Sequence, residues 1–321
     1  MPKKKRILCI TPNVSLDRTY VVPGCAPGWV WRARETSVVC GGKGVNVART
    51  IRLLGGEVAC AGLLAGRAGQ VAAELAATEG LQCHWSWISG ETRTNVIIIG
   101  AAGGGATVIN APGPEVSNAD WQRFVTDVAA EAEKAACLCL CGSLPPGVGG
   151  ADMTALVMRL RQNGRPLWVD SSGEALAGAV AGQPQGIKIN AEEVGQLLGG
   201  RIITAAEAVA AAHEVQRRGV ETVVITLGQA GAVAVTAEAV WRAEAPLVEA
   251  DNPVGSGDSF LGALTRSLLQ GLPMVEALRR ATAAGSAAAL QRQRTAFEET
   301  DFFRLLPAVR ILPEGERTVP A

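Results

Sequence analysis

The sequence of 321 residues carries no net charge, because Lys plus Arg and Asp plus Glu each number 30. No overall field therefore attracts nucleic acid or an anionic membrane surface, and any polyanionic ligand has to be met by a local group of cations. We expect neither a nucleic-acid partner nor a membrane partner.

Long apolar runs are also missing. The chain has no stretch of the ~20 apolar residues needed to span a bilayer. Residues 1–6 lack the apolar core of a signal peptide, and the basic run KKKR at residues 3–6 is read more simply as a solvated lead into the first strand than as an interaction tail. We expect a cytoplasmic protein.

Patterns that would indicate a metal centre are absent as well. The eight cysteines form no C-x-x-C motif. Cys137, Cys139 and Cys141 alternate along an apolar segment, which predicts one face of a strand and buried, reduced thiols. His84 and His213 lie beside no motif, so neither is expected to be catalytic or to bind a metal.

What the sequence does contain is an alternation of apolar, strand-like segments with amphipathic, helix-like ones, which is typical of a doubly wound α/β sheet. The chain is long enough for one large domain, so we expect residues 1–321 to form a single one. Strands are expected at residues 6–11, 58–64, 136–141, 167–170, 187–190 and 223–227, and helices at residues 47–54, 70–78, 153–161 and 274–290, with a further one starting at residue 117.

Residues 251–260, with the sequence DNPVGSGDSF, predict a sharp turn into a helix that runs to about residue 270. The free N–H groups at the start of such a helix form an anion site, and Gly255 and Gly257 let the backbone pass close to a ligand. Asp258 in the first turn is either a helix cap or a base that takes a proton from an attacking hydroxyl. The two glycines that flank Ser256 favour the second interpretation.

A second glycine-rich stretch, GGKGVNVA at residues 41–48, precedes another predicted helix. Glycines leave room for a ligand, and the ammonium group of Lys43 among them is best explained by a bound anion. A glycine-rich loop alone is weak evidence for function. In particular, no G-x-G-x-x-G follows the first strand with an acidic residue about 20 positions later, which argues against a dinucleotide-binding oxidoreductase.

Together, GSGD at residues 255–258 and GGKGVNVA at residues 41–48 resemble the signature pair of the PfkB/ribokinase family of sugar kinases. The chain is most similar to the phosphosugar branch, with 1-phosphofructokinase, tagatose-6-phosphate kinase and the minor 6-phosphofructokinase, from about Ile7 to Leu290. The resemblance implies a ribokinase-like, mostly parallel sheet flanked by helices, with a small β-sheet lid from about residues 18–40 and 92–110. Within the lid, 96–99 and 107–109 fit strands, with a turn at 103–105.

The resemblance further implies ATP-dependent phosphorylation of a ketohexose phosphate to the bisphosphate, with Asp258 as the general base and Gly255, Ser256 and Gly257 steadying the transition state. Asp17, which by itself would be read as a turn residue, corresponds to an Asp that holds sugar hydroxyls. Ser143 fits either a phosphate ligand or a backbone cap. The implied sugar-phosphate site comprises Asp17, Gly42, Lys43, Asn46, Arg93 and Ser143. An unphosphorylated sugar or a nucleoside, the alternative substrate, would not need these cations.

For the nucleotide, the resemblance implies ATP with Mg²⁺, held through water by Asn190 and Glu193. These two residues are three apart, so both side chains can face one point at the helix start. The alternative is an N-cap with an acidic first turn, and one pair could serve both purposes. The implied nucleotide site comprises Lys188, Asn190, Thr226, Gly228, Gly231, Thr282 and Ser286. A homodimer through the lid and a monovalent cation are further implications, and the residues do not decide among fructose 1-phosphate, fructose 6-phosphate and tagatose 6-phosphate.

Overall fold

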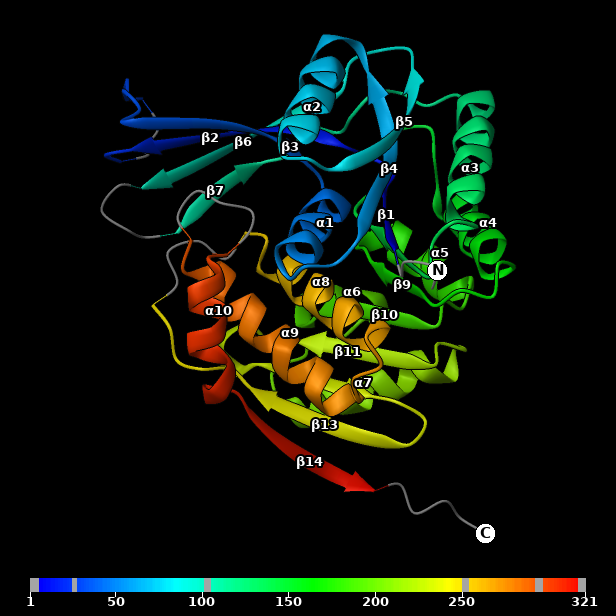
Figure 1. Cartoon of the computed structure of the whole chain (residues 1–321), viewed down its shortest axis with the longest axis vertical. Helices are drawn as coiled ribbons and strands as arrows, with labels where there is room; N and C mark the ends of the chain where they lie inside the picture. Colours follow the sequence, from blue (N-terminus) through cyan, green and yellow to red (C-terminus); the bar gives the residue numbers. More distant parts are fainter. Residues whose placement is uncertain (1–5, 25–27, 101–104, 250–253, 292–296, 317–321) are drawn as a thin grey trace.

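A ten-stranded sheet forms the centre of the molecule in the computed structural model, which describes residues 6–24, 28–100, 105–249, 254–291 and 297–316 (Figure 1). Its order is β14-β13-β12-β11-β10-β9-β8-β1-β4-β5. Seven neighbouring strands are parallel, namely β1 (Ile7–Thr11), β4 (Val58–Ala65), β5 (Gln82–Ile88), β8 (Cys137–Cys141), β9 (Leu167–Asp170), β10 (Gly186–Asn190) and β11 (Thr222–Thr226). Antiparallel strands extend one edge, namely β12 (Ala232–Val235), β13 (Ala239–Glu244) and β14 (Arg310–Glu316).

Helices cover both faces of this sheet. Side chains alternate along each strand, so the buried strands present apolar residues to both faces. In β1, for example, Cys9 belongs to the apolar cluster of one face and Leu8 to that of the other. The first face packs against α1 (Lys43–Leu53), α2 (Gly66–Thr78), α8 (Ser256–Leu269), α9 (Met274–Ala289) and α10 (Glu299–Leu305). The second packs against α3 (Asn118–Ala132), α4 (Gly150–Arg161), α5 (Gly173–Ala181), α6 (Ala191–Leu198) and α7 (Ala205–Arg217).

The predicted doubly wound architecture is therefore confirmed, and the predicted strands and helices are present with ends shifted by a few residues. Cys137, Cys139 and Cys141 lie on one face of β8, as the alternation predicts. The sequence did not predict β5, α5, α10 or the antiparallel edge formed by β12, β13 and β14. The turns expected at residues 103–105 and 251–253 fall wholly or mainly outside the described residues.

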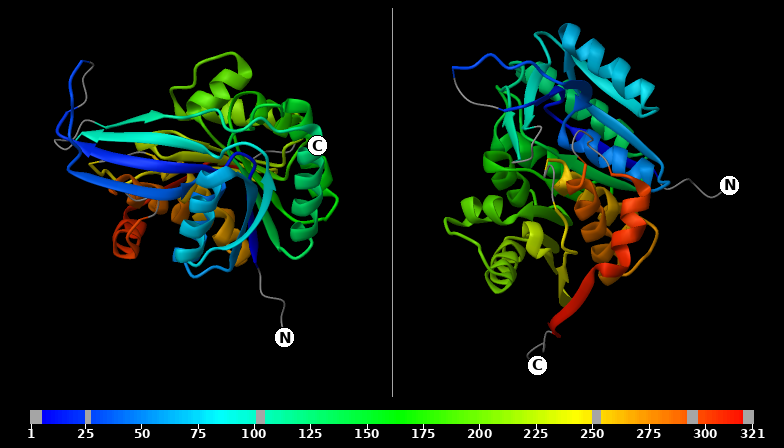
Figure 2. Two further views of the ribbon diagram at one scale, coloured as in Figure 1. Left: turned by 90° about the horizontal axis from the view of Figure 1, so that it is seen from above. Right: turned by 90° about the vertical axis from the view of Figure 1, so that its left-hand side faces the viewer.

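A separate four-stranded sheet projects from the main body (Figures 1 and 2). Its strands, in the order β3-β2-β6-β7, are β2 (Ser15–Val22), β3 (Glu35–Gly41), β6 (Arg93–Gly100) and β7 (Ala106–Ile109). The small sheet has its own apolar cluster of Val21, Ile97 and Ile99. Asp17 lies within β2, opposite Val39 and Asn95, rather than in a turn after β1.

The strand order creates a crevice at one edge of the main sheet. Strand β1 lies between β4 and β8, so the chain leaves it first toward one side and later toward the other. Ligands of open α/β sheets bind at such a point, outside the carboxyl ends of the strands.

Among the helices that the structure describes, none combines the length and the apolar character needed to cross a membrane.

Candidate active site

A cavity of about 790 Å³ lies at this point and is bounded by both sheets and by α1, α8 and α9. Such a volume is within the range of small-molecule sites. All the candidate site residues except Glu193 line this cavity. They are Asp17, Gly42, Lys43, Asn46, Arg93, Ser143, Lys188, Asn190, Thr226, Gly228, Gly231, Gly255, Ser256, Gly257, Asp258, Thr282 and Ser286. Segments that are distant in sequence therefore meet at one place.

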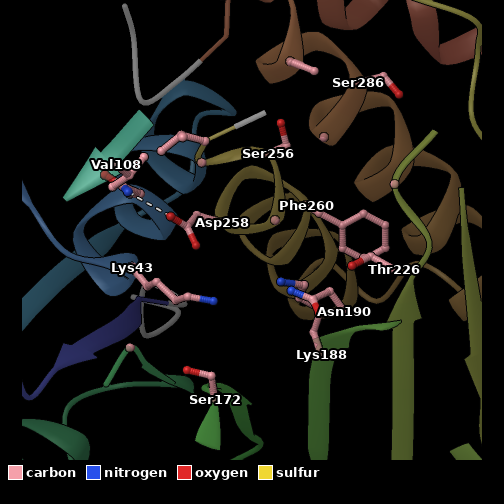
Figure 3. A pocket seen from close by; sticks show the side chains of 18 of the residues that line it. Lys43, Val108, Ser172, Lys188, Asn190, Thr226, Ser256, Asp258, Phe260 and Ser286 are labelled. Carbon is pink, nitrogen blue, oxygen red and sulfur yellow. Dashed lines mark hydrogen bonds between the residues drawn. The ribbon is translucent and has the colours of Figure 1, made fainter. Parts of the chain in front are cut away.

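Asp258 lies in the first turn of α8, but it does not cap that helix. The N-cap is Gly255, whose φ of 83° is in the left-handed region that favours glycine. The Asp258 side chain is 6% exposed, and its Oδ2 accepts a hydrogen bond of 2.8 Å from Nδ2 of Asn46 in α1 (Figure 3). A buried carboxylate at the mouth of a helix is thus held by another helix and points into the cavity.

The surroundings of Asp258 raise its pKa from 3.8 to about 6. Burial is the largest cause, because it disfavours the charged form, and the nearby Asp170 carboxylate adds to it. Lys43, Asn46 and Lys188 act in the opposite direction. A carboxyl group with such a pKa is ionised at neutral pH and is a stronger base than an exposed aspartate.

The start of α8 provides an anion site beside this carboxylate. The first N–H groups of a helix have no partner within it and carry the positive end of the helix dipole. The ammonium group of Lys188 lies against this backbone, since a Cβ atom on Gly257 would be 2.7 Å from Lys188 Nζ. Ser256 Oγ is buried and has no hydrogen-bond partner among the described residues. The arrangement suits a phosphate group.

Asp170 is a central residue that the sequence reasoning did not assign. Its buried carboxylate accepts hydrogen bonds from Lys188 Nζ at 2.6 Å and from Lys43 Nζ at 2.7 Å. Burial would raise the pKa of Asp170, but the two lysines outweigh it and hold the pKa below its ordinary value. One carboxylate thus fixes two ammonium groups from different elements. The sequence signal that could have indicated Asp170 as a site residue is its position at the carboxyl end of a predicted parallel strand.

Lys43 is therefore not a free cation in this structure. Besides Asp170, it faces the Glu193 carboxylate at 3.6 Å. Burial favours the neutral amine, yet Asp170, Asp258 and Glu193 together raise the pKa of Lys43 above its usual value. Figure 3 shows Lys43 and Asp258 across the cavity from Lys188 and Asn190. The ammonium group of Lys43 is therefore held in its charged form at the centre of the cavity, between carboxylates from several elements.

The small sheet supplies the other end of the cavity. Asp17 Oδ1 accepts hydrogen bonds from Ser15 Oγ at 2.7 Å and from Asn95 Nδ2 at 2.8 Å. Ser15 and Asn95 were not predicted from the sequence, although both line the cavity. Two donors on one oxygen fix the carboxylate and leave its second oxygen, which packs against Gly41, available to a ligand.

Arg93 and Ser143 are joined to this end through Asn13, another residue that was not predicted. The Arg93 guanidinium donates to the carbonyl oxygens of Asn13 at 2.9 Å and Ala111 at 3.1 Å, and its buried Nε has no partner among the described residues. Burial lowers the pKa of Arg93. Ser143 Oγ accepts a hydrogen bond of 3.3 Å from Asn13 Nδ2. Cationic and hydroxyl groups thus face this end of the cavity from fixed positions.

Asn190 and Glu193 form a reciprocal cap at the start of α6. Asn190 Oδ1 accepts from the Glu193 N–H at 2.8 Å, and Glu193 Oε2 accepts from the Asn190 N–H at 2.9 Å. Asn190 and Glu193 therefore have the capping role that the sequence offers as one interpretation. The remaining oxygen of Glu193 faces Lys43.

The residues present fit a Mg²⁺ ion that comes with a nucleotide better than one held by the protein alone. Such an ion keeps several waters and takes one or two carboxylates besides the phosphates. Glu193 provides one such carboxylate near the cavity, whereas no group of three or more Cys, His, Asp or Glu side chains with metal-site geometry occurs among the residues that the structure describes.

The remaining nucleotide candidates lie on β11, the turn after it and α9. Thr226 Oγ1 donates to the Ile189 carbonyl at 3.4 Å, and Thr282 Oγ1 donates to the Leu278 carbonyl within its own helix. Gly231 has a φ of 99° and lies so close to β13 that any Cβ atom would clash with the Ala243 carbonyl. The fold alone therefore requires a glycine at position 231.

An open α/β sheet with helix N-terminal amides, lysines and a buried carboxylate around one crevice defines a phosphoryl-transfer enzyme. The model of the pfkB family carbohydrate kinases matches residues 6–301. The chain belongs to this family, and its acceptor is a hydroxyl group.

Two curated relatives and one solved structure illustrate the similarity. The chain is 33% identical to 1-phosphofructokinase of Escherichia coli K12 over 287 residues, which cover 89% of this chain and 92% of that protein. It is also 33% identical to ATP-dependent 6-phosphofructokinase isozyme 2 of the same strain, covering 89% and 93%. The structure of Escherichia coli phosphofructokinase-2 in complex with potassium is 29% identical and covers 95% of this chain and 98% of that one, with a TM-score of 0.86.

Proposed function

We propose that the protein transfers the γ-phosphoryl group of ATP to a primary hydroxyl of a ketohexose phosphate and so forms a bisphosphate. The observation that carries the proposal is the meeting of Asp258, the amides of α8 and the Lys43–Asp170–Lys188 group with Asp17 and Arg93 of the small sheet in one cavity. The names of the curated relatives, 1-phosphofructokinase and ATP-dependent 6-phosphofructokinase, support the donor and the substrate class.

In this mechanism Asp258 accepts the proton of the attacking hydroxyl as that oxygen moves toward the γ-phosphorus. The N–H groups of residues 255–257 and the ammonium group of Lys188 face the charge on the transferred group. Asp17 orients the sugar through its hydroxyls, and the small sheet acts as a lid that keeps water from competing for the phosphoryl group. Mg²⁺, near Asn190 and Glu193, would neutralise charge on the nucleotide oxygens.

Two cationic side chains favour a phosphorylated acceptor. Arg93 lies beside Asp17 at the sugar end, and Lys43 projects from the glycine-rich start of α1 into the same cavity. A neutral sugar or a nucleoside gains little from these charges, whereas a phosphate forms charge-assisted hydrogen bonds with them. Fructose 1-phosphate, fructose 6-phosphate and tagatose 6-phosphate all remain within this substrate class.

A coupled assay of ADP release tests the proposal. The purified protein is given ATP with each of the three ketohexose phosphates, with free fructose and ribose, and with adenosine, each with and without Mg²⁺ and K⁺. We expect Mg²⁺-dependent turnover with at least one ketohexose phosphate. Preferred turnover of a free sugar or a nucleoside would overturn the substrate class. The potassium arm tests a monovalent-cation requirement, which the potassium complex of Escherichia coli phosphofructokinase-2 supports.

The activity should depend on pH through Asp258. Its pKa of about 6 in the folded protein means that the carboxylate is ionised above this pH and protonated below it. Turnover should therefore fall about tenfold for each pH unit below about 6 and reach a plateau above it. The measurement is the pH profile of kcat between pH 5 and 8. A profile that stays flat down to about pH 4.5 would contradict a base with this raised pKa.

Exposed apolar side chains in and beside the small sheet also support a homodimer. Trp29 and Val30, in the connection between β2 and β3, are 74% and 88% exposed, and Ile109 at the end of β7 is 57% exposed. We propose that a second copy of the chain covers these side chains. Light scattering of the purified protein should give twice the monomer mass of 33.2 kDa. A monomer at micromolar concentration would count against this assembly.

A further inference from the structure

A chain of hydrogen bonds continues behind Asp258 into the protein. Asn46 donates from Nδ2 to Asp258, and its Oδ1 accepts a hydrogen bond of 2.7 Å from Arg49 Nη1 one turn further along α1. Arg49 in turn donates from Nε at 2.5 Å and from Nη2 at 2.7 Å to the two carboxylate oxygens of Glu79. The same Nη2 donates to the Cys40 carbonyl at 2.6 Å.

The chemistry of these groups allows one orientation of the Asn46 amide. A guanidinium group has N–H donors and no acceptor, so only the amide oxygen of Asn46 can face Arg49. The amide nitrogen must then face Asp258. We propose that Arg49, anchored by Glu79, is a positioning residue that keeps the Asn46 N–H directed at the Asp258 carboxylate. This inference rests on the proposed function, in which Asp258 is the base.

Arg49 is well placed to act as a fixed support. It is 9% exposed, and burial works against its charge, but Glu79 outweighs this effect and raises the pKa of Arg49 above its usual value. Glu79 is the C-cap of α2, and the Cys40 carbonyl lies at the end of β3, directly before the glycine-rich turn. The guanidinium group thus joins α1, α2 and the small sheet behind the base.

Without this support the amide of Asn46 is free to turn. Its oxygen could then face Asp258, where it stabilises only the protonated carboxyl group, because an ionised carboxylate cannot donate. The other charged groups that face Asp258 are Lys43 on α1, Asp170 on β9 and Lys188 on β10. None of them is bonded to Arg49 in the described residues, so a change at Arg49 reaches Asp258 through Asn46.

The test uses Arg49→Leu, Arg49→Lys and Glu79→Gln, with Arg52→Gln as the matched control. Arg52 is exposed on the same helix. The low-pH limb of the kcat profile should move up by about one pH unit in Arg49→Leu, which lowers turnover about fivefold at pH 6 and about tenfold well below it. Arg49→Lys keeps one donor for Asn46 and should recover part of the shift, while Glu79→Gln should give an intermediate shift. The control should leave the profile unchanged.

A second readout does not depend on activity. Titration of Asp258 is followed by NMR of protein labelled with ¹³C at the aspartate carboxyl groups, with the resonance assigned by its loss in Asp258→Asn. The titration midpoint should rise in the three test variants and stay unchanged in Arg52→Gln. Midpoints within about 0.2 units of wild type in every folded test variant would overturn the positioning role. If the wild-type protein phosphorylates none of the substrates, the proposed function fails, but this titration still decides the role of Arg49.

Discussion

Asp258→Asn should lower turnover by at least about 100-fold, because the amide keeps the shape of the side chain but cannot take the proton of the attacking hydroxyl. Binding of the sugar phosphate should persist, since Asp17, Lys43 and Arg93 are unchanged and lie elsewhere on the cavity wall. The measurements are single-turnover kinetics of the variant and its affinity for the sugar phosphate by calorimetry.

The stability of the folded protein should increase in Asp258→Asn, although its turnover falls. The pKa of Asp258 is raised in the folded state, so ionisation of this carboxyl destabilises the folded protein as pH rises from about 4 through about 6. Removing the buried charge should therefore raise Tm at pH 7, with a gain in the free energy of unfolding on the order of 1–3 kcal/mol. Wild-type Tm combined with wild-type turnover would refute both the burial of a charge here and its use as a base.

Asp152→Asn is the matched control for this variant. Asp152 also lies in the first turn of a helix, α4, but its carboxylate accepts a hydrogen bond from the Gly149 N–H and it does not line the cavity. It should lose part of a cap, with a modest loss of stability of about 1 kcal/mol, and retain turnover. A similar loss of activity in both variants would mean that the effect of Asp258→Asn is not specific to proton transfer at the cavity.

The sequence predicts Asp258 and Lys43 as site candidates because their signal is local. In each case a charged residue stands among or beside glycines at the start of a helix, and this pattern can be read without knowing the fold. The alternation of strands and helices likewise predicts the sheet, and parallel strands bring their carboxyl ends to one edge. The meeting of the two motifs is a consequence of that topology.

Asp170 and Arg49 could not be assigned in this way, because their roles depend on partners that are distant in sequence. Lys43 is 127 residues from Asp170, and Glu79 is 30 residues from Arg49. An Arg at a helical position is usually solvated, and an Asp where a strand ends is usually a turn residue. Only the three-dimensional structure shows that the Arg49 and Asp170 side chains are buried and bonded.

The antiparallel edge of the main sheet was missed for a different reason. Residues 232–244 read AVAVTAEAVWRAE, and short apolar stretches rich in Ala suit a helix or a strand about equally well. The structure resolves this choice through the pairing of β12 with β11. Asp17 shows the same limit, since the turn after β1 is short enough for the residue to fall on a new strand.

Asp170→Asn should have the second large effect, on both stability and turnover. The Asp170 side chain is fully buried and the Lys188 side chain is 3% exposed, so the amide would leave an ammonium group buried without its counter-charge. Breaking such a pair costs about 3–5 kcal/mol. Turnover should fall at least about 100-fold, because Lys43 and Lys188 lose the group that fixes them beside the phosphate path.

The stability lost in Asp170→Asn should become smaller at low pH. The pKa of Asp170 is depressed in the folded state, so its contribution to stability is present above the unfolded pKa of about 4 and is lost as pH falls below it. The difference in Tm between wild type and Asp170→Asn should therefore narrow in acid. Asp301→Asn, which removes a partly exposed pair with Arg304, should change Tm little at any pH.

The double variant Asp170→Asn with Lys188→Met separates stability from function. Met fills much of the volume of Lys188 without its charge, so the double variant should be more stable than Asp170→Asn alone. Its turnover should stay low, because the ammonium group beside Gly257 is gone. Recovery of turnover together with stability would mean that Asp170 and Lys188 serve only the fold. Recovery of stability alone would place the pair in phosphoryl transfer, since the crevice would then be intact but without its fixed charge.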